Sequence, residues 1–152
     1  MTPETAKPAV VRLERTIPAP PHRVYRAWLD PEVLCRWMAP GRRTVTRAEV
    51  DEREGGSHRI WHGDGGGFDS QLLALDPGER IVFLWGFVGP DRISDIGLAS
   101  RLTIELRDAP GGATALTLVH DRLEAIDAAM PGMARSTAAG WAMALDKLAA
   151  TL

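Results

Sequence analysis

The fold is decided by the sequence VYRAWLDPEVLCRW at Val24–Trp37, which predicts two short helices joined by a tight connection. Within it, Asp30 is a favourable helix cap, Pro31 suits the first helical position, and Glu32 is stabilising near a helix N-terminus. Strand patterns lie on both sides of this stretch. Two small helices inserted after the first strand of an antiparallel sheet predict a fold built around a cavity.

Alternating apolar and polar residues predict strands before and after the two helices. The first strand covers Ala9–Pro18 and ends at a group of prolines. Six further runs of strand length are separated by glycine- and proline-rich turns; they are Thr44–Arg53, Ser57–His62, Phe68–Leu75, Arg80–Val88, Ala99–Asp108 and Thr114–Asp121. Because the connections are short, neighbouring strands are expected to pair as hairpins.

A long amphipathic helix is predicted at the C-terminal end, after the pair Pro131-Gly132. Its apolar residues recur at spacings of three and four; they are Ala134, Ala138, Trp141, Leu145, Leu148 and Leu152. The order of elements predicts an α+β fold in which a curved seven-stranded antiparallel sheet wraps around this helix. The two short helices then close one end, and a cavity is expected between sheet and helix.

The chain has 152 residues, which suits one domain. We expect this domain over residues 9–152, after a flexible tail over residues 1–8. A net charge of −2 and a pI near 6.1 argue against a nucleic-acid partner. A single cysteine, Cys35, and the lack of an apolar signal or membrane span predict a cytoplasmic protein. No cofactor or metal is expected, and a homodimer is left open.

Four stretches in this order and spacing resemble the heat-shock-protein-90 ATPase activator homologue family, part of the START-like, polyketide-cyclase-like (SRPBCC) superfamily. They are Arg15–Pro20 continuing into Val24–Trp28, Asp30–Glu32 continuing through Arg36-Trp37 to Pro40, Leu75–Trp85, and Gly140-Trp141 continuing through Leu145–Ala149. The resemblance implies a helix-grip fold with a ligand-sized cavity. Some superfamily members bind lipids, hormones or polyketides, a few are cyclases or hydrolases, and fused relatives act as co-chaperones. Many small bacterial members have no assigned activity.

Two positions depart from the pattern of the family. Relatives often have paired tryptophans at the end of the second helix, and here the second is Met38. Relatives often have histidine four residues before the tryptophan of the last helix, and here that position is Thr137. A role that depends on that histidine therefore does not carry over to this chain.

The resemblance implies that His58, Ile60 and His62 point from one strand face into the cavity, with His120 approaching from the last strand. One interpretation is that these histidines lie at the rim, solvated or bonded to the backbone; the other is that they orient a polar group of a ligand. The tryptophans can belong to the core and to the cavity wall at once. The predicted ligand-binding residues are Trp37, His58, Ile60, His62, Phe83, Trp85, Leu102, Leu118, His120, Thr137 and Trp141.

Other site chemistry is not favoured by the sequence. On a strand, the Cα atoms of His58 and His62 lie about 13 Å apart, at ~3.3 Å per residue, too far to share one metal ion easily. The glycine run 63–67 lacks the ending of a phosphate-binding loop and predicts a hairpin turn. Cys35 is expected to be a buried or neutral structural thiol, although Arg36 beside it would favour the thiolate.

The sequence therefore leaves three hypotheses of function. The first is a protein that binds a small, mainly apolar molecule, with Met130 and Met133 as an adaptable entrance or simply as packing for the connector. The second is a cyclase, dehydratase or hydrolase using His120 with another acid–base group, namely Asp121, His62 or Glu124. Adjacent strand residues point to opposite faces, so His120 and Asp121 make a poor pair. The third is a protein-interaction module with a chaperone as partner.

Overall fold

The computed structural model describes residues 10–63, 65–93 and 98–152, and the predicted tail over residues 1–8 lies outside them. Its helices and strands follow in the order β1 (Val11–Ile17), α1 (Pro21–Ala27), α2 (Pro31–Trp37), β2 (Val45–Val50), β3 (Ser57–His62), β4 (Gly67–Asp76), β5 (Arg80–Trp85), β6 (Phe87–Val88), β7 (Ser100–Ala109), the short 3-10 helix η2 (Pro110–Gly112), β8 (Ala113–Asp121), α3 (Glu124–Ala129) and α4 (Met133–Thr151).

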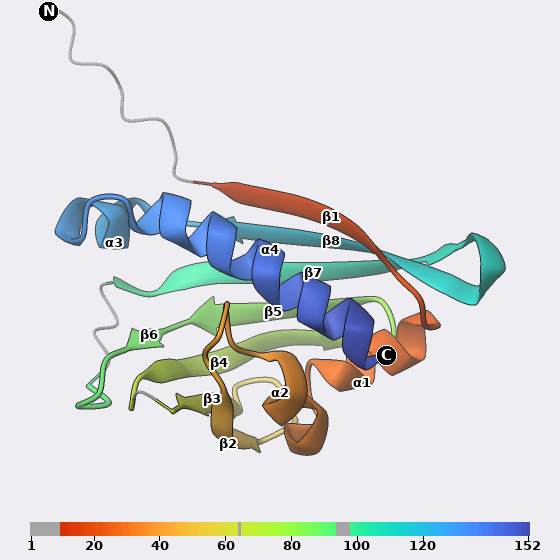
Figure 1. Ribbon diagram of the computed structural model, residues 1–152, viewed down its shortest axis with the longest axis horizontal. Coiled ribbons are helices and arrows are strands. Elements are labelled where there is room, and N and C mark those ends of the chain that lie inside the picture. The colour runs from red at the N-terminus through yellow and green to blue at the C-terminus, as the bar shows by residue number, and fades with distance from the viewer. Residues whose placement is uncertain (1–9, 64, 94–97) are drawn as a thin grey trace, which may run out of the picture.

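The sheet is antiparallel, and α4 crosses one of its faces (Figure 1). The strands lie in the order β1-β8-β7-β5-β4-β3-β2. The first strand, β1, is therefore at one edge of the sheet and pairs with the last strand, β8. These are the seven predicted strands, with two short helices after β1 as expected. The predicted α+β fold is confirmed, and α3 is an additional helix within the connector before α4.

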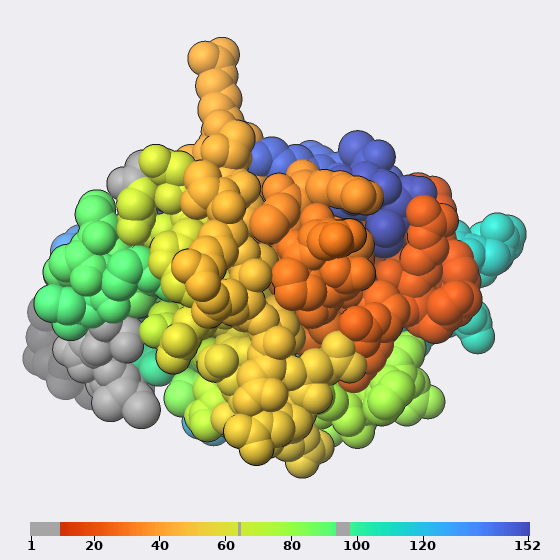
Figure 2. Space-filling view, turned by 90° about the horizontal axis from the view of Figure 1, so that it is seen from below, coloured from red at the N-terminus to blue at the C-terminus, as the bar shows by residue number. Residues whose placement is uncertain are grey.

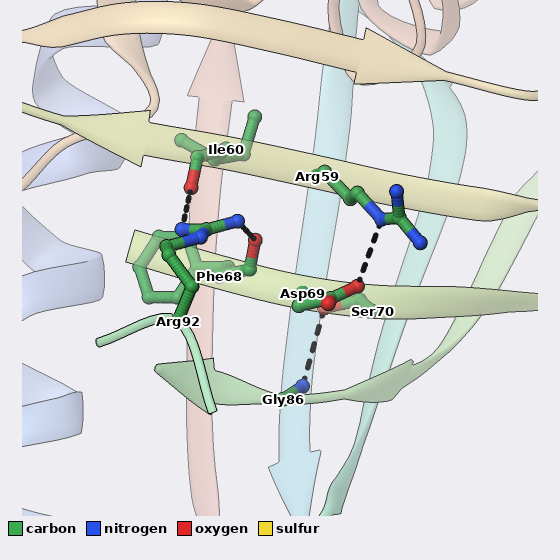
Figure 3. Close-up of polar contacts among 7 residues, drawn as sticks. All are labelled: Arg59, Ile60, Phe68, Asp69, Ser70, Gly86 and Arg92. Carbon is green, nitrogen blue, oxygen red and sulfur yellow. Dashed lines mark hydrogen bonds and ion pairs between the residues drawn. The ribbon is translucent and has the colours of Figure 1, made fainter. Parts of the chain in front are cut away.

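The eighth strand, β6, arises because the predicted strand Arg80–Val88 is divided at Gly86. The Gly86 N–H donates to the Ser70 hydroxyl at 3.2 Å (Figure 3). The Gly86 carbonyl accepts a hydrogen bond from the Asp69 N–H at 2.9 Å. A Cβ atom at Gly86 would lie 2.2 Å from the Asp69 carbonyl oxygen. Glycine is therefore needed for the close approach of the two backbones at this break.

The two short helices begin as the sequence predicts and pack through tryptophans. The Asp30 carboxylate accepts a hydrogen bond from the Glu32 N–H at 3.0 Å and so caps α2. Trp28 and Trp37 are buried in an edge-to-face pair with ring centroids 4.6 Å apart. The Trp37 indole N–H also donates to the Ala27 carbonyl at 3.0 Å, so α2 is tied to the end of α1.

The core lies between the sheet, the two short helices and α4. The predicted apolar stripe of α4 faces it through Trp141, Leu145 and Leu148, which are all buried. Figure 2 shows α2 and the segment after it, in orange, lying against the blue C-terminal helix. Among the helices that the structure describes, none is long and apolar enough to cross a membrane.

Gly86→Ala is expected to lower the free energy of unfolding by about 2–3 kcal/mol, because the new methyl group overlaps the β4 backbone. Urea unfolding followed by circular dichroism measures this change. Gly89→Ala is the matched control, since its Cβ would meet only the Asp91 carboxylate at an ordinary 3.7 Å. Equal stability of the two variants would contradict this account of the strand break.

Candidate functional site

A pocket lies where the first half of α4 meets the segment after α2 and the strands β4 and β6. Its volume is about 240 Å³. Most of its lining is apolar, and the residues are Met38, Ala39, Pro40, Arg43, Phe68, Phe87, Met133, Ser136, Thr137, Gly140, Trp141 and Ala144. The pocket is therefore built from four segments that are distant in sequence and meet only in the fold.

Helical spacing brings the α4 residues of the wall together. Met133, Thr137, Trp141 and Ala144 follow at spacings of four, four and three, which places them on one face of the helix. Gly140 has no side chain on this face, and a Cβ atom there would fill the gap to the Pro40 ring, at 3.5 Å. Gly140 therefore adds to the open space between α4 and Pro40 on this side of the pocket.

Trp141 is held on the wall by a chain of hydrogen bonds. Its indole N–H donates to Nδ1 of His120 at 3.0 Å. An indole nitrogen only donates, so Nδ1 of His120 is unprotonated and the imidazole proton lies on Nε2. Nε2 then donates to the Ser100 hydroxyl at 2.6 Å. The tautomer of His120 and the orientation of Trp141 are fixed by the same three side chains.

Burial keeps two histidines neutral. Loss of hydration lowers the pKa of His120 to about 3, although nearby Asp121 acts in the opposite direction. Protonation of Nδ1 would in addition set one N–H against the N–H of Trp141. Loss of hydration likewise lowers the pKa of His58 to about 4, against the effect of its hydrogen bond to the Trp28 carbonyl.

His58 and His62 hold the ends of the two short helices. The Nε2 atom of His58 donates to the Trp28 carbonyl at 2.8 Å, and Trp28 is the C-cap of α1. The Nε2 atom of His62 donates to the Met38 carbonyl at 3.1 Å, and Met38 is the C-cap of α2. A carbonyl oxygen only accepts, which sets the proton on Nε2 in both rings. One strand face therefore satisfies a terminal carbonyl of each helix.

The structure places only part of the predicted ligand-binding set on the pocket wall. Thr137 and Trp141 line the pocket. The remaining predicted residues are buried in the packed core outside this wall; they are Trp37, His58, Ile60, His62, Phe83, Trp85, Leu102, Leu118 and His120. The three histidines are buried and do not lie at a solvated rim. His58 and His62 are bonded to backbone carbonyls, which is the one part of the first interpretation that the structure shows, and His120 is bonded to two side chains.

Several wall residues were not in the predicted set, and some carried a usable signal. Met133, Gly140 and Ala144 share the helical spacing of Thr137 and Trp141, so extending that spacing would have found them. Met133 lies on the wall as an adaptable entrance requires, whereas Met130 is exposed and outside it. Phe68 and Phe87 oppose each other across β4 and β6, a pairing that depends on the break at Gly86.

The predicted acid–base groups do not meet at the pocket. His120 is hydrogen bonded through both ring nitrogens behind Trp141. Asp121 forms two hydrogen bonds with Arg101, which lowers the pKa of its carboxyl group. His62 is bonded to the Met38 carbonyl, and Glu124 begins α3. None of these side chains is among the described residues of the wall.

Cys35 differs from the expectation of a buried thiol. It is exposed on α2. Loss of hydration nevertheless raises the pKa of its thiol, so Cys35 is protonated at neutral pH as the sequence suggested.

The family model described as activator of Hsp90 ATPase homolog 1-like protein matches residues 18–152. The match covers both short helices, the strands after them and α4. The chain belongs to this family. The resemblance to the SRPBCC superfamily is thereby confirmed, together with its helix-grip-like fold. No curated protein matches the chain.

Solved structures of bacterial proteins share the fold. Protein CV1439 from Chromobacterium violaceum is 32% identical with a TM-score of 0.73, and the match covers 94% of this chain and 96% of that chain. A protein from Rhizobium leguminosarum is 28% identical with a TM-score of 0.67, covering 95% and 94% of the two chains. Protein Ms6760 from Mycobacterium smegmatis is 22% identical with a TM-score of 0.78, covering 95% and 90%, and shows the fold alone.

Two residues singled out in the sequence analysis lie at the pocket. Met38 and Thr137, the two departures seen in the sequence, both lie on its wall. The Thr137 hydroxyl donates to the Met133 carbonyl at 2.8 Å, so it is engaged inside α4. A flexible thioether and a short side chain therefore shape this part of the wall.

Stability is expected to fall as the pH drops below about 6.5, because the unfolded histidines bind protons there while folded His58 and His120 stay neutral. The stability from their neutral forms is complete above pH 6.5 and is lost as the pH falls toward their folded pKa values of about 4 and about 3. Urea unfolding at pH 7.0 and 5.0 is expected to give a difference of about 4 kcal/mol.

His120→Gln is expected to reduce this difference to about half, since one of the two proton-binding groups is removed. A pH dependence that is unchanged by this substitution, or flat in the parent protein, would contradict the assignment of His120 as a buried neutral group.

Proposed function

We propose that the protein binds a small, mainly apolar molecule in the pocket between α4, the segment after α2 and strands β4 and β6. The observation that carries the proposal is the wall itself, where Met38, Phe68, Phe87, Met133 and Trp141 enclose space beside the core. Apolar surface left open at a concave site is a common feature of ligand-binding pockets, because a ligand gains free energy by removing it from water.

The size of the pocket supports a compact ligand. Its volume of about 240 Å³ exceeds the ~150 Å³ of an apolar cavity that accepts benzene, and lies below the ~300–1,000 Å³ of sites for drug-sized molecules. A molecule of one or two rings, or a branched aliphatic chain of similar volume, matches this space.

The wall combines a rigid part and an adaptable part. Trp141 is fixed through His120 and Ser100, which gives one flat surface of set orientation. Met38 and Met133 contribute unbranched thioether side chains, which adjust to ligands of different shape. This combination supports binding of a flat apolar group against Trp141.

Binding is favoured over catalysis by the polar groups of the wall. Among the described residues that line it, Arg43 is the charged one, and the hydroxyl groups come from Ser136 and Thr137. Of the acid–base candidates of the sequence, His120 and His62 are buried in the core, Asp121 is paired with Arg101, and Glu124 is exposed on α3. The fold alone does not separate the two functions, since one fold hosts many.

Naphthalene is expected to bind with a Kd of about 0.1–1 mM, as suits a ligand of ten carbon atoms. Titration followed by tryptophan fluorescence is the measurement, because Trp141 lies on the wall. Ala144→Leu is expected to weaken binding by about tenfold or more, since the larger side chain extends into the pocket.

Ala139→Leu is the matched control, because Ala139 is on the exposed side of the same helix and outside the wall. It is expected to keep the affinity of the parent protein. No saturable binding of naphthalene, or equal weakening by both substitutions, would refute the proposed site.

A further inference from the structure

Two walls of the pocket come from distant parts of the chain and face each other. The segment after α2 contributes Ala39, Pro40 and Arg43, and α4 contributes a row that includes Gly140 and Ala144. A Cβ atom at Gly140 would lie 3.5 Å from the Pro40 ring, so a space of about one methyl group separates the walls there. The width of the pocket is therefore set by the spacing between this segment and α4.

Lys147 joins the two walls. From α4, its ammonium group donates to the Ala39 carbonyl at 2.6 Å and to the Arg43 carbonyl at 3.2 Å. Both accepting residues line the pocket. Lys147 follows Ala144 of the opposite wall by three residues, which places the two on the same side of the helix. Because the hydrogen bonds end on backbone carbonyls, they constrain the backbone of the facing wall itself.

The residue type at this position suits its contacts. Lys7 and Lys147 are the only lysines among the 18 lysine and arginine residues of the chain. An ammonium group is a compact charge with three donors, so it can bond two separate carbonyls from one nitrogen atom. A guanidinium group presents its donors in a planar fork, which matches the two oxygens of one carboxylate better. In a chain that otherwise uses arginine, lysine therefore occupies the position that bridges the walls.

We propose that Lys147 is a positioning residue that sets the upper size limit of the ligand, because it fixes the spacing of the two walls. The inference rests on the proposed function and adds a determinant of its specificity. At this spacing, a ligand of two rings fills the pocket. A third ring finds space only when the segment after α2 moves away from α4, and that movement breaks the hydrogen bonds of Lys147. Larger ligands are therefore disfavoured.

The test compares quinoline, which has two fused rings, with acridine, which has three. Both compounds are uncharged at pH 8. Chemical-shift titration by NMR gives the two Kd values, and the measured quantity is their ratio. The parent protein is expected to bind quinoline more tightly. Lys147→Met keeps an unbranched side chain without the donors. It is expected to shift the ratio about fivefold in favour of acridine, because the third ring can then be buried.

Two control variants are expected to keep the ratio of the parent protein. Arg135→Met removes a positive charge from an exposed position of the same helix, outside the pocket wall. Thr114→Val removes the buried hydrogen bond from the Thr114 hydroxyl to the Ala19 carbonyl at 2.6 Å, also away from the wall. The first variant controls for the loss of charge, and the second controls for a general loss of stability.

Gly140→Ala tests the fixed spacing from the other wall. Alanine favours a helix more than glycine does, so the fold is retained. The new methyl group fills the gap to Pro40. Because Lys147 holds the walls together, this space is not regained, and the affinity for quinoline is expected to fall by about threefold or more. A segment that moved freely would shift away from the methyl group and keep the affinity.

The outcomes separate the two proposals. An unchanged ratio in Lys147→Met, or an equal shift in either control variant, overturns the role of Lys147 and leaves the pocket standing. A parent protein that binds acridine as tightly as quinoline overturns it as well. Unchanged quinoline affinity in Gly140→Ala contradicts the fixed spacing, even if Lys147→Met does not fold. Failure of both compounds to bind the parent protein refutes the proposed function and the inference with it.

Discussion

The structure depends first on two hydrogen bonds from β3 to the ends of the short helices. His58 and His62 lie four residues apart on one strand face, about 13 Å at ~3.3 Å per residue, and reach the C-caps of α1 and α2. Each bond satisfies a carbonyl that a helix end leaves open, inside a core where an unsatisfied carbonyl is costly. Because Met38 is one of these caps, the same bonds set the start of the segment that forms one side of the pocket.

The position of the pocket follows from the aromatic residues around it. Trp28, Phe83, Trp85 and Trp141 form a connected cluster that fills the space between the sheet and α4. The pocket lies at the edge of this cluster, where Gly140 of α4 faces Pro40 of the segment after α2 and no large side chain stands between them. The Ser100–His120–Trp141 chain holds the last ring of the cluster, so a polar group on the far strand determines one wall of an apolar site.

The segment after β6 is bonded to the neighbouring strands β3 and β4 through Arg92. Arg92 donates to the carbonyls of Ile60 and Phe68, at 2.8 and 3.4 Å, where β3 and β4 meet (Figure 3). Its guanidinium group also lies 4.5 Å from the centre of the Trp61 ring. These contacts fasten the segment after β6 to β3 and β4, close to Phe68 on the wall of the pocket.

The sequence by itself determined the class and order of the elements, because local signals decide them: the Asp30 cap, the proline and glycine punctuation, and the apolar period of α4. It also singled out Met38 and Thr137, which both lie on the pocket wall. Tertiary structure alone decided which side chains meet at the pocket. Ring orientation, the hydrogen-bond partners of His58, His62 and His120, and the approach of α4 to Pro40 depend on contacts between segments distant in sequence. Strand alternation assigns a histidine to the inner face, but only the packed structure determines whether it meets a ligand, a helix end or an indole.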